Sequence, residues 1–125
     1  RVINFEKTNL RNLSKEKLVH FPFSIIVMDL SFISLTKVLH RAWSFLSIGG
    51  TVIALVKPQF ECAKKEADIG RGIIRDPLIH KRVLNEIKYF ADQNLLNSQL
   101  IAEEEAIPKG TDGNTEFFLA WKKRK

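Results

Sequence analysis

The chain has 125 residues, of which 45% are hydrophobic, and this is enough for one domain with its own core. Its formal net charge of +6 favours a polyanionic partner such as nucleic acid, although an ordinary basic surface would give the same excess. A single cysteine, Cys62, excludes an internal disulfide and fits a reducing cytoplasm. The longest nearly apolar run, residues 48–56, is far shorter than the ~20 residues of a membrane span, so we expect no stable membrane insertion.

Three apolar runs predict strands in the first half of the chain. The first covers residues 1–5, the second covers residues 25–28 and ends in Asp29, and the third covers residues 51–56 and ends in Lys57. Continuous apolar runs predict strands that are buried on both faces, as in a parallel sheet. Open α/β sheets bind their ligands at the carboxyl ends of the strands, which makes Asp29 and Lys57 candidate catalytic residues.

A helix is predicted between the second and third strands, because apolar residues recur at helical spacing over residues 35–46. Gly49 and Gly50 are typical of a left-handed cap that ends such a helix. A strand, a helix and a strand in this order predict two parallel strands joined by a crossover. The following residues 59–75 are rich in charge and lack strong periodicity, which predicts an irregular lid or binding loop.

The second half of the chain predicts one long helix and a strand pair. Asp76–Pro77 is typical of a helix start, and the helix is expected over residues 78–94. Strands over residues 98–107 and 115–121 flank the turn residues 108–114, which predicts an antiparallel hairpin whose acidic first strand either lies at an edge or frays at its end. The elements together predict an α/β fold with a mostly parallel sheet, a C-terminal antiparallel hairpin and helices on the faces.

Each candidate residue also has an ordinary structural explanation. Asp29 could cap the following helix, although Ser31 or Ser34 could do so equally well. Lys57 could project into solvent beyond its strand. A lysine held at a desolvated strand end beside another cation can instead lose its proton near neutrality and act as a base. The pattern alone favours Glu116 as an outward-facing residue of an edge strand.

The sequence predicts no metal site and no cysteine nucleophile. His20, His40 and His80 are far apart, and no Cys/His spacing resembles a zinc motif. We expect His40 and His80 to be solvated on helix faces, and Cys62 has no obvious catalytic partner. Trp121 could belong to the core or to a stacking surface.

Four motifs occur in order along the chain, at residues 27–35 (VMDLSFISL), 56–61 (VKPQFE), 72–77 (GIIRDP) and 113–118 (GNTEFF). In this combination they resemble the TlyA family, also called hemolysin A proteins, whose FtsJ-like domain methylates RNA. The resemblance covers essentially the whole chain. It implies a Rossmann-like class I methyltransferase fold, S-adenosylmethionine as cofactor, and a ribose 2′-hydroxyl of ribosomal RNA as methyl acceptor.

The resemblance also implies roles for single residues. FtsJ-like enzymes use a Lys-Asp-Lys-Glu tetrad, and Asp29, Lys57 and Glu116 match its second, third and fourth members. The first lysine would belong to a segment before Arg1. The expected cofactor contacts are Asp29 and the adenine-pocket residues Thr8, Asn9 and Leu10, and the predicted RNA contacts are Lys64, Lys65, Arg71 and Arg75.

By the same resemblance, residues 1–125 are predicted to be the C-terminal portion of a single FtsJ-like methyltransferase domain. The family's N-terminal S4 RNA-binding domain and glycine-rich cofactor loop are absent from this sequence, so we expect the chain by itself to be inactive. Its expected partner is ribosomal RNA or a ribosomal subunit in the cytoplasm, and not DNA. The strand over residues 25–28 would expose an apolar edge, which favours self-association.

Two other functions stay open on the sequence. One is an RNA-binding protein of the same fold that does not catalyse methyl transfer. The other is a membrane-active hemolysin, which needs a membrane span or a strongly amphipathic surface helix, and neither is evident here.

Overall fold

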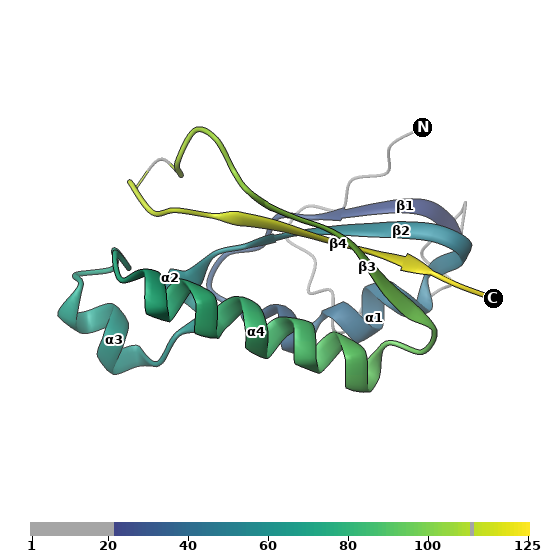
Figure 1. Cartoon of the computed structure of the whole chain (residues 1–125), viewed down its shortest axis with the longest axis horizontal. Coiled ribbons are helices and arrows are strands. Elements are labelled where there is room, and N and C mark those ends of the chain that lie inside the picture. Colours follow the sequence, from purple (N-terminus) through teal and green to yellow (C-terminus); the bar gives the residue numbers. More distant parts are fainter. Residues whose placement is uncertain (1–21, 111) are drawn as a thin grey trace.

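The computed structural model describes residues 22–110 and 112–125, in which four strands form one mixed sheet in the order β1-β2-β4-β3 (Figure 1). The strands are β1 (Phe23–Met28), β2 (Leu46–Val56), β3 (Ser98–Glu105) and β4 (Phe117–Lys123). The helices are η3 (Leu35–Lys37), α1 (Leu39–Ser44), α2 (Pro58–Glu61), α3 (Lys64–Ile69) and α4 (Pro77–Asn94). The strand expected over residues 1–5, and Thr8, Asn9, Leu10 and His20, lie outside the described residues.

The strand pairings confirm the parallel crossover and the C-terminal hairpin. Strands β1 and β2 are parallel, with Met28 opposite Ala54. Strand β4 is antiparallel to β2, with Phe117 opposite Val56, and it is also antiparallel to β3. Strand β3 therefore lies at one end of the described sheet, as expected, and β4 lies inside it.

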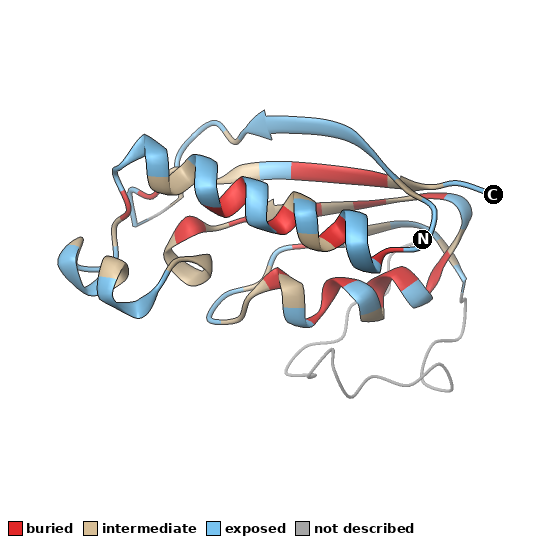
Figure 2. Ribbon diagram, turned by 60° about the horizontal axis from the view of Figure 1, so that its bottom comes forward, coloured by how far each residue is buried: buried red, intermediate tan, exposed pale blue. Residues whose placement is uncertain are grey.

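The core lies between the sheet and helices α1 and α4, which cover one face of it (Figures 1 and 2). Figure 2 shows that α4 turns its buried residues toward the sheet, whereas β3 is exposed along nearly its whole length. Burial of apolar area is the main stabilising contribution here. The indole of Trp121 belongs to this core and not to a stacking surface; other fully buried residues are Leu39, Val52, Val83, Ile87 and Leu119.

Strand β1 is not buried on both faces, so that prediction was wrong. Ile25 and Val27 are 63% and 67% exposed, while Met28 is buried in the core. Strand β1 ends the described sheet, and the described helices cover only one of its faces. A continuous apolar run in the sequence does not distinguish a strand that is covered on both faces from one that is covered on only one face.

The helix predicted over residues 35–46 is present only in part, because it is divided into η3 and α1 and ends before β2 begins at Leu46. Gly49 and Gly50 do not end a helix but lie inside β2, where the register with β1 shifts. Gly49 has a left-handed φ of +84°, and a Cβ on Gly50 would lie 2.9 Å from the Ser24 carbonyl oxygen. Glycine is therefore required here for a bulge and a close approach of two strands.

Helix α4 has the predicted start, and the preceding segment has more structure than predicted. The Asp76 carboxylate accepts a hydrogen bond from the Leu78 amide at 2.9 Å, and Pro77 is the first helical residue. Residues 59–75 do not form one irregular loop, since they include most of α2 and all of α3. Both helices are too short to produce a recognisable apolar period.

Candidate active site at the carboxyl ends of β1 and β2

Two predicted site residues meet at one edge of the sheet. Asp29 directly follows β1 and Lys57 directly follows β2, and parallel neighbouring strands end at the same edge. The Lys57 Nζ lies 2.6 Å from the Asp29 Oδ1, and the Lys57 side chain is only 14% exposed whereas that of Asp29 is 65% exposed. The Ser31 hydroxyl accepts a second hydrogen bond from Lys57 at 3.3 Å.

In the structure Asp29 does not cap a helix, and Lys57 does not extend into solvent. Ser34, and not Asp29, caps η3, because the Ser34 side chain accepts from the Thr36 amide. Lys57 does not project into solvent. The side-chain amine is held between a carboxylate and a hydroxyl and is largely shielded from water.

Glu116 reaches the same edge from the opposite strand direction. Val56 of β2 is paired with Phe117 of β4. Because the two strands are antiparallel, the next residue after Val56, Lys57, lies opposite the residue before Phe117, which is Glu116. Because β4 lies inside the sheet, the expected placement of Glu116 on an edge strand was wrong. The Glu116 carboxylate lies against the turn at Gly110, where a Cβ would be 2.9 Å from Oε2.

A buried amide organises the turn that precedes Glu116. Asn114 is 1% exposed, and its side chain donates to the Gly72 carbonyl at 2.8 Å and accepts from the Ile74 amide at 2.9 Å. It also donates to the Asp112 carboxylate at 2.8 Å. The Asn114 backbone N–H is the main cause that lowers the pKa of Asp112, and the positive charge of Lys57 acts weakly in the same direction.

A half-buried carboxylate connects the segments that follow β1 and β2. The Glu61 carboxylate accepts from the Ser34 hydroxyl at 2.6 Å and from the Leu35 amide at 2.8 Å. Burial raises the pKa of Glu61, although both hydrogen bonds act to lower it. No role was predicted for Glu61 or Asn114 from the sequence; the only signal is that each lies within a motif that includes a candidate catalytic residue.

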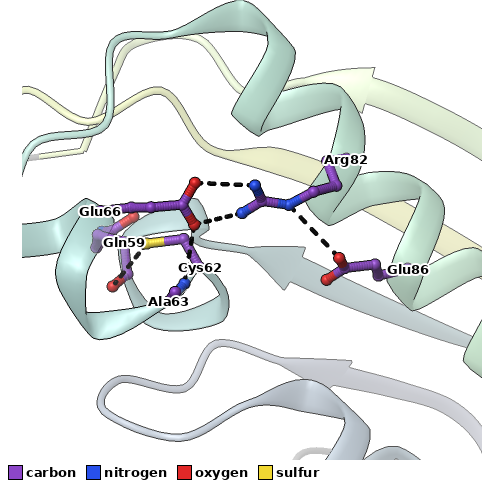
Figure 3. A network of polar contacts seen from close by, with 6 residues as sticks. All are labelled: Gln59, Cys62, Ala63, Glu66, Arg82 and Glu86. Atoms are coloured by element: carbon purple, nitrogen blue, oxygen red, sulfur yellow. Dashed lines mark hydrogen bonds and ion pairs between the residues drawn. The ribbon is translucent and has the colours of Figure 1, made fainter.

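The four predicted RNA contacts are all exposed and lie on α3 and the loop after it. Figure 3 shows how α3 is held against α4: the Arg82 guanidinium binds both carboxylate oxygens of Glu66 and also approaches Glu86. The Glu66 carboxylate accepts in addition from the Ala63 amide at 3.1 Å. Hydrogen bonds from Arg82 are the main cause that lowers the pKa of Glu66. On α3 and the loop after it, the exposed cations are Lys64, Lys65, Arg71 and Arg75.

Other nucleophilic and metal-binding side chains form no second centre in the described part of the chain. Burial is the main cause that raises the pKa of Cys62, which disfavours a reactive thiolate. His40 is exposed as expected, but His80 is not simply solvated: its Nε2 lies 2.7 Å from the Ile74 carbonyl oxygen, and its ring contacts Phe117 edge-on. Residues 22–110 and 112–125 contain no group of three potential metal ligands.

Among the helices that the structure describes, none has both the length and the apolar character needed to cross a bilayer.

The sequence matches a known protein family and several curated proteins. A family model described as FtsJ-like methyltransferase matches residues 1–123. The 16S/23S rRNA (cytidine-2'-O)-methyltransferase TlyA of Mycobacterium tuberculosis is 34% identical over 119 residues, which cover 95% of this chain and 43% of the relative. Hemolysin A of Brachyspira hyodysenteriae is 32% identical over 120 residues, which cover 94% and 48%. The chain thus spans less than half the length of these curated relatives.

Solved structures show the same fold. A Lactococcus lactis protein described as a putative hemolysin superposes with a TM-score of 0.87 at 33% identity, covering 99% of this chain and 60% of that one. A SAM-dependent methyltransferase from Methanosarcina mazei superposes with a TM-score of 0.57 at 14% identity, covering 94% and 65%. The latter identity supports a likeness of fold alone. Together these superpositions confirm the predicted Rossmann-like class.

Proposed function

The chain belongs to the FtsJ-like methyltransferase family, and from this premise we propose that it transfers methyl from S-adenosylmethionine to a ribose 2′-hydroxyl of ribosomal RNA. The observation that carries this proposal is the 2.6 Å contact between Lys57 and Asp29 at the ends of two parallel strands. Within the longer relatives, we propose that this chain corresponds to the C-terminal portion of the methyltransferase domain. The transfer itself belongs to the full-length protein.

The residues at this edge fit a cationic cofactor. Asp29 keeps 65% of its side chain exposed while it pairs with Lys57, so one side of the carboxylate stays open to a ligand. Bound S-adenosylmethionine would supply an electrophilic methyl group. Contact of Thr8, Asn9 and Leu10 with the adenine ring stays a prediction, outside the described residues.

Lys57 serves as the base in this proposal. A ribose hydroxyl is a weak acid, and a positioned base contributes typically ~10²–10⁴-fold to such a reaction. In its uncharged form the Lys57 amine would accept the proton of the 2′-hydroxyl while the hydroxyl oxygen takes up the methyl group. Asp29 and Ser31 fix the direction of the amine, and Glu116 orients the hydroxyl from the β4 side, so that the site acts mostly by positioning.

The exposed cations on α3 and the following loop supply the RNA contacts. Lys64 and Lys65 lie on a helix that the Arg82–Glu66 contact holds against α4, so their charges are presented from a fixed element. Lysine and arginine side chains neutralise phosphates without reading the sequence. The partner is ribosomal RNA, alone or in a ribosomal subunit. A 2′-hydroxyl is present in RNA and not in DNA, which supports RNA as the proposed partner, and a ribosomal substrate is consistent with a cytoplasmic location.

Substitution of Lys57 tests the proposal. In the natural full-length protein, Lys57→Ala should lower methyl transfer to ribosomal RNA at least 100-fold, because it removes the base. The transfer is measured with methyl-labelled S-adenosylmethionine, and cofactor affinity, measured by calorimetry, should change less than threefold. Lys37→Ala is the matched control, since Lys37 is an exposed lysine at the end of η3. Wild-type turnover by the Lys57 variant would refute the assignment.

A further inference from the structure

We propose that Glu61 is a positioning residue for the Lys57–Asp29 pair, a role that rests on the proposed methyltransferase function. The hydrogen bonds of Glu61 go to Ser34 and Leu35 and not to either residue of the pair. It acts by joining the segment that carries Lys57 to the segment that carries Asp29. Its two hydrogen bonds connect residues that are 27 and 26 positions apart in the sequence.

On the Lys57 side, Glu61 belongs to the same single turn of helix. Lys57 is the N-cap of α2, and its carbonyl accepts from the Phe60 amide at 2.9 Å. A four-residue helix is not stable by itself, because so short a helix forms few hydrogen bonds for the residues that it fixes. Its place at the end of β2 therefore depends on tertiary contacts. These contacts include the burial of Pro58 and the hydrogen bonds of Glu61.

On the Asp29 side, the hydrogen bonds hold the segment between β1 and η3. Ser34 and Leu35 donate to the two different oxygens of Glu61. Between Asp29 and Ser34 the backbone is strained, since Phe32 has a left-handed φ of 64° although it is not glycine. Such a conformation persists only where surrounding contacts impose it.

A second contact joins the same two segments. The rings of Phe32 and Phe60 lie with their centroids 4.7 Å apart. The segments are thus held together at three levels: Lys57 contacts Asp29 and Ser31, the two phenylalanines contact each other, and Glu61 closes the far end. Loss of the Glu61 bonds would leave only the Phe32–Phe60 ring contact and the contacts of Lys57 with Asp29 and Ser31 among these three levels.

The chemistry of the partners explains why this position carries a carboxylate. Two donors, a hydroxyl and a backbone amide, converge on it, and a carboxylate can accept both. A glutamine could still accept from Leu35 and donate to the Ser34 oxygen. The Ser34 hydroxyl also lies 2.8 Å from that of Thr36, so it can turn its hydrogen there. Glu61→Gln can therefore keep the hydrogen bonds to Ser34 and Leu35 without the charge, whereas Glu61→Ala removes both hydrogen bonds.

The test compares Glu61→Ala with Glu61→Gln in the natural full-length protein. Glu61→Ala should lower kcat about 10- to 100-fold, which is the scale expected from a displacement of about 1 Å in the reacting groups. KM for RNA and the dissociation constant for S-adenosylmethionine should change less than threefold. Glu61→Gln should restore at least a third of wild-type kcat, and Ser34→Ala should give an intermediate loss.

A control separates positioning from general stability. Ala91→Gly weakens α4 at its C-terminal end, far along the chain from either segment, and should leave kcat near wild type. Hydrogen exchange gives a readout that needs no activity: Glu61→Ala should accelerate exchange in residues 29–37 and leave α4 unchanged. This measurement tests the connection even if the protein does not methylate RNA.

The outcomes are distinguishable. An inactive wild-type protein would refute the proposed function, and the catalytic part of this inference with it. An active wild type with unchanged kcat in Glu61→Ala would refute the positioning role alone. So would a kcat loss no greater than that of Ala91→Gly, or a failure of Glu61→Gln to restore activity.

Discussion

The buried amide of Asn114 gives the sharpest test of how the site is held together. Asn114→Ala removes three side-chain hydrogen bonds, to Gly72, Ile74 and Asp112. Ile74 is itself buried, so its amide would lose its partner without access to water. An unsatisfied buried donor costs about 1–3 kcal/mol, and two further partly buried bonds contribute about 0.5–1.5 kcal/mol each. We therefore expect a loss of roughly 2–6 kcal/mol in the free energy of unfolding.

Urea unfolding followed by tryptophan fluorescence measures this loss, since Trp43 and Trp121 are both buried in the core. Asn94→Ala is the matched control, because the Asn94 side chain also donates one hydrogen bond, to the Phe90 carbonyl, but is exposed. That control should lose less than about 0.5 kcal/mol, as is usual for surface substitutions. A loss below about 1 kcal/mol for Asn114→Ala would refute the reasoning.

A second substitution at the same position tests the direction of the hydrogen bonds. Asn114→Asp keeps an acceptor for the Ile74 amide but cannot donate to Gly72, and it places a second carboxylate beside Asp112. Like charges at this distance favour protonation, so the variant should recover stability as the pH falls. Equal pH dependence in Asn114→Asp and Asn114→Ala would contradict this account.

Two further predictions concern charge. The first replaces four exposed cations with glutamine: Lys64, Lys65, Arg71 and Arg75. RNA binding should weaken, and the slope of the logarithm of the binding constant against the logarithm of the salt concentration should fall by about 0.7–0.9 per lost phosphate contact. An unchanged slope would exclude these residues from the interface. Burial raises the pKa of Glu61 in the folded chain, so this group's contribution to stability falls as the pH rises from the ordinary glutamate range through the raised pKa. Glu61→Gln should remove this loss of stability with rising pH. If the urea midpoint of the variant changed with pH as much as that of the wild type, the prediction would be contradicted.

The sequence was most informative where a pattern is local. Apolar runs that end in Asp29 and Lys57 located two strand ends, and the Asp76–Pro77 cap located the start of α4. Pairing of those two strands followed from general rules for α/β units and brought both residues to one edge. Motif resemblance then added Glu116, which pattern alone placed on an edge strand.

Features that depend on distant contacts were missed. Gly49 and Gly50 are typical helix-ending residues, and only the approach of β1 shows that they form a bulge within β2. Glu61 and Asn114 act through partners 26 to 42 positions away, and no local spacing encodes such contacts. Exposure of Ile25 and Val27 depends equally on which faces of the sheet the helices cover.

The antiparallel direction of β4 has a consequence for folding kinetics. Its pairing with β3 spans a short connection, whereas its pairing with β2, and that of β2 with β1, join segments far apart in the chain. Contacts between distant segments form slowly, because a long loop must close before they are gained. The β3–β4 hairpin can therefore form early and carry Glu116 with it. Asp29, Lys57 and Glu116 reach one edge only in the last, long-range steps, so the site is completed when the sheet is.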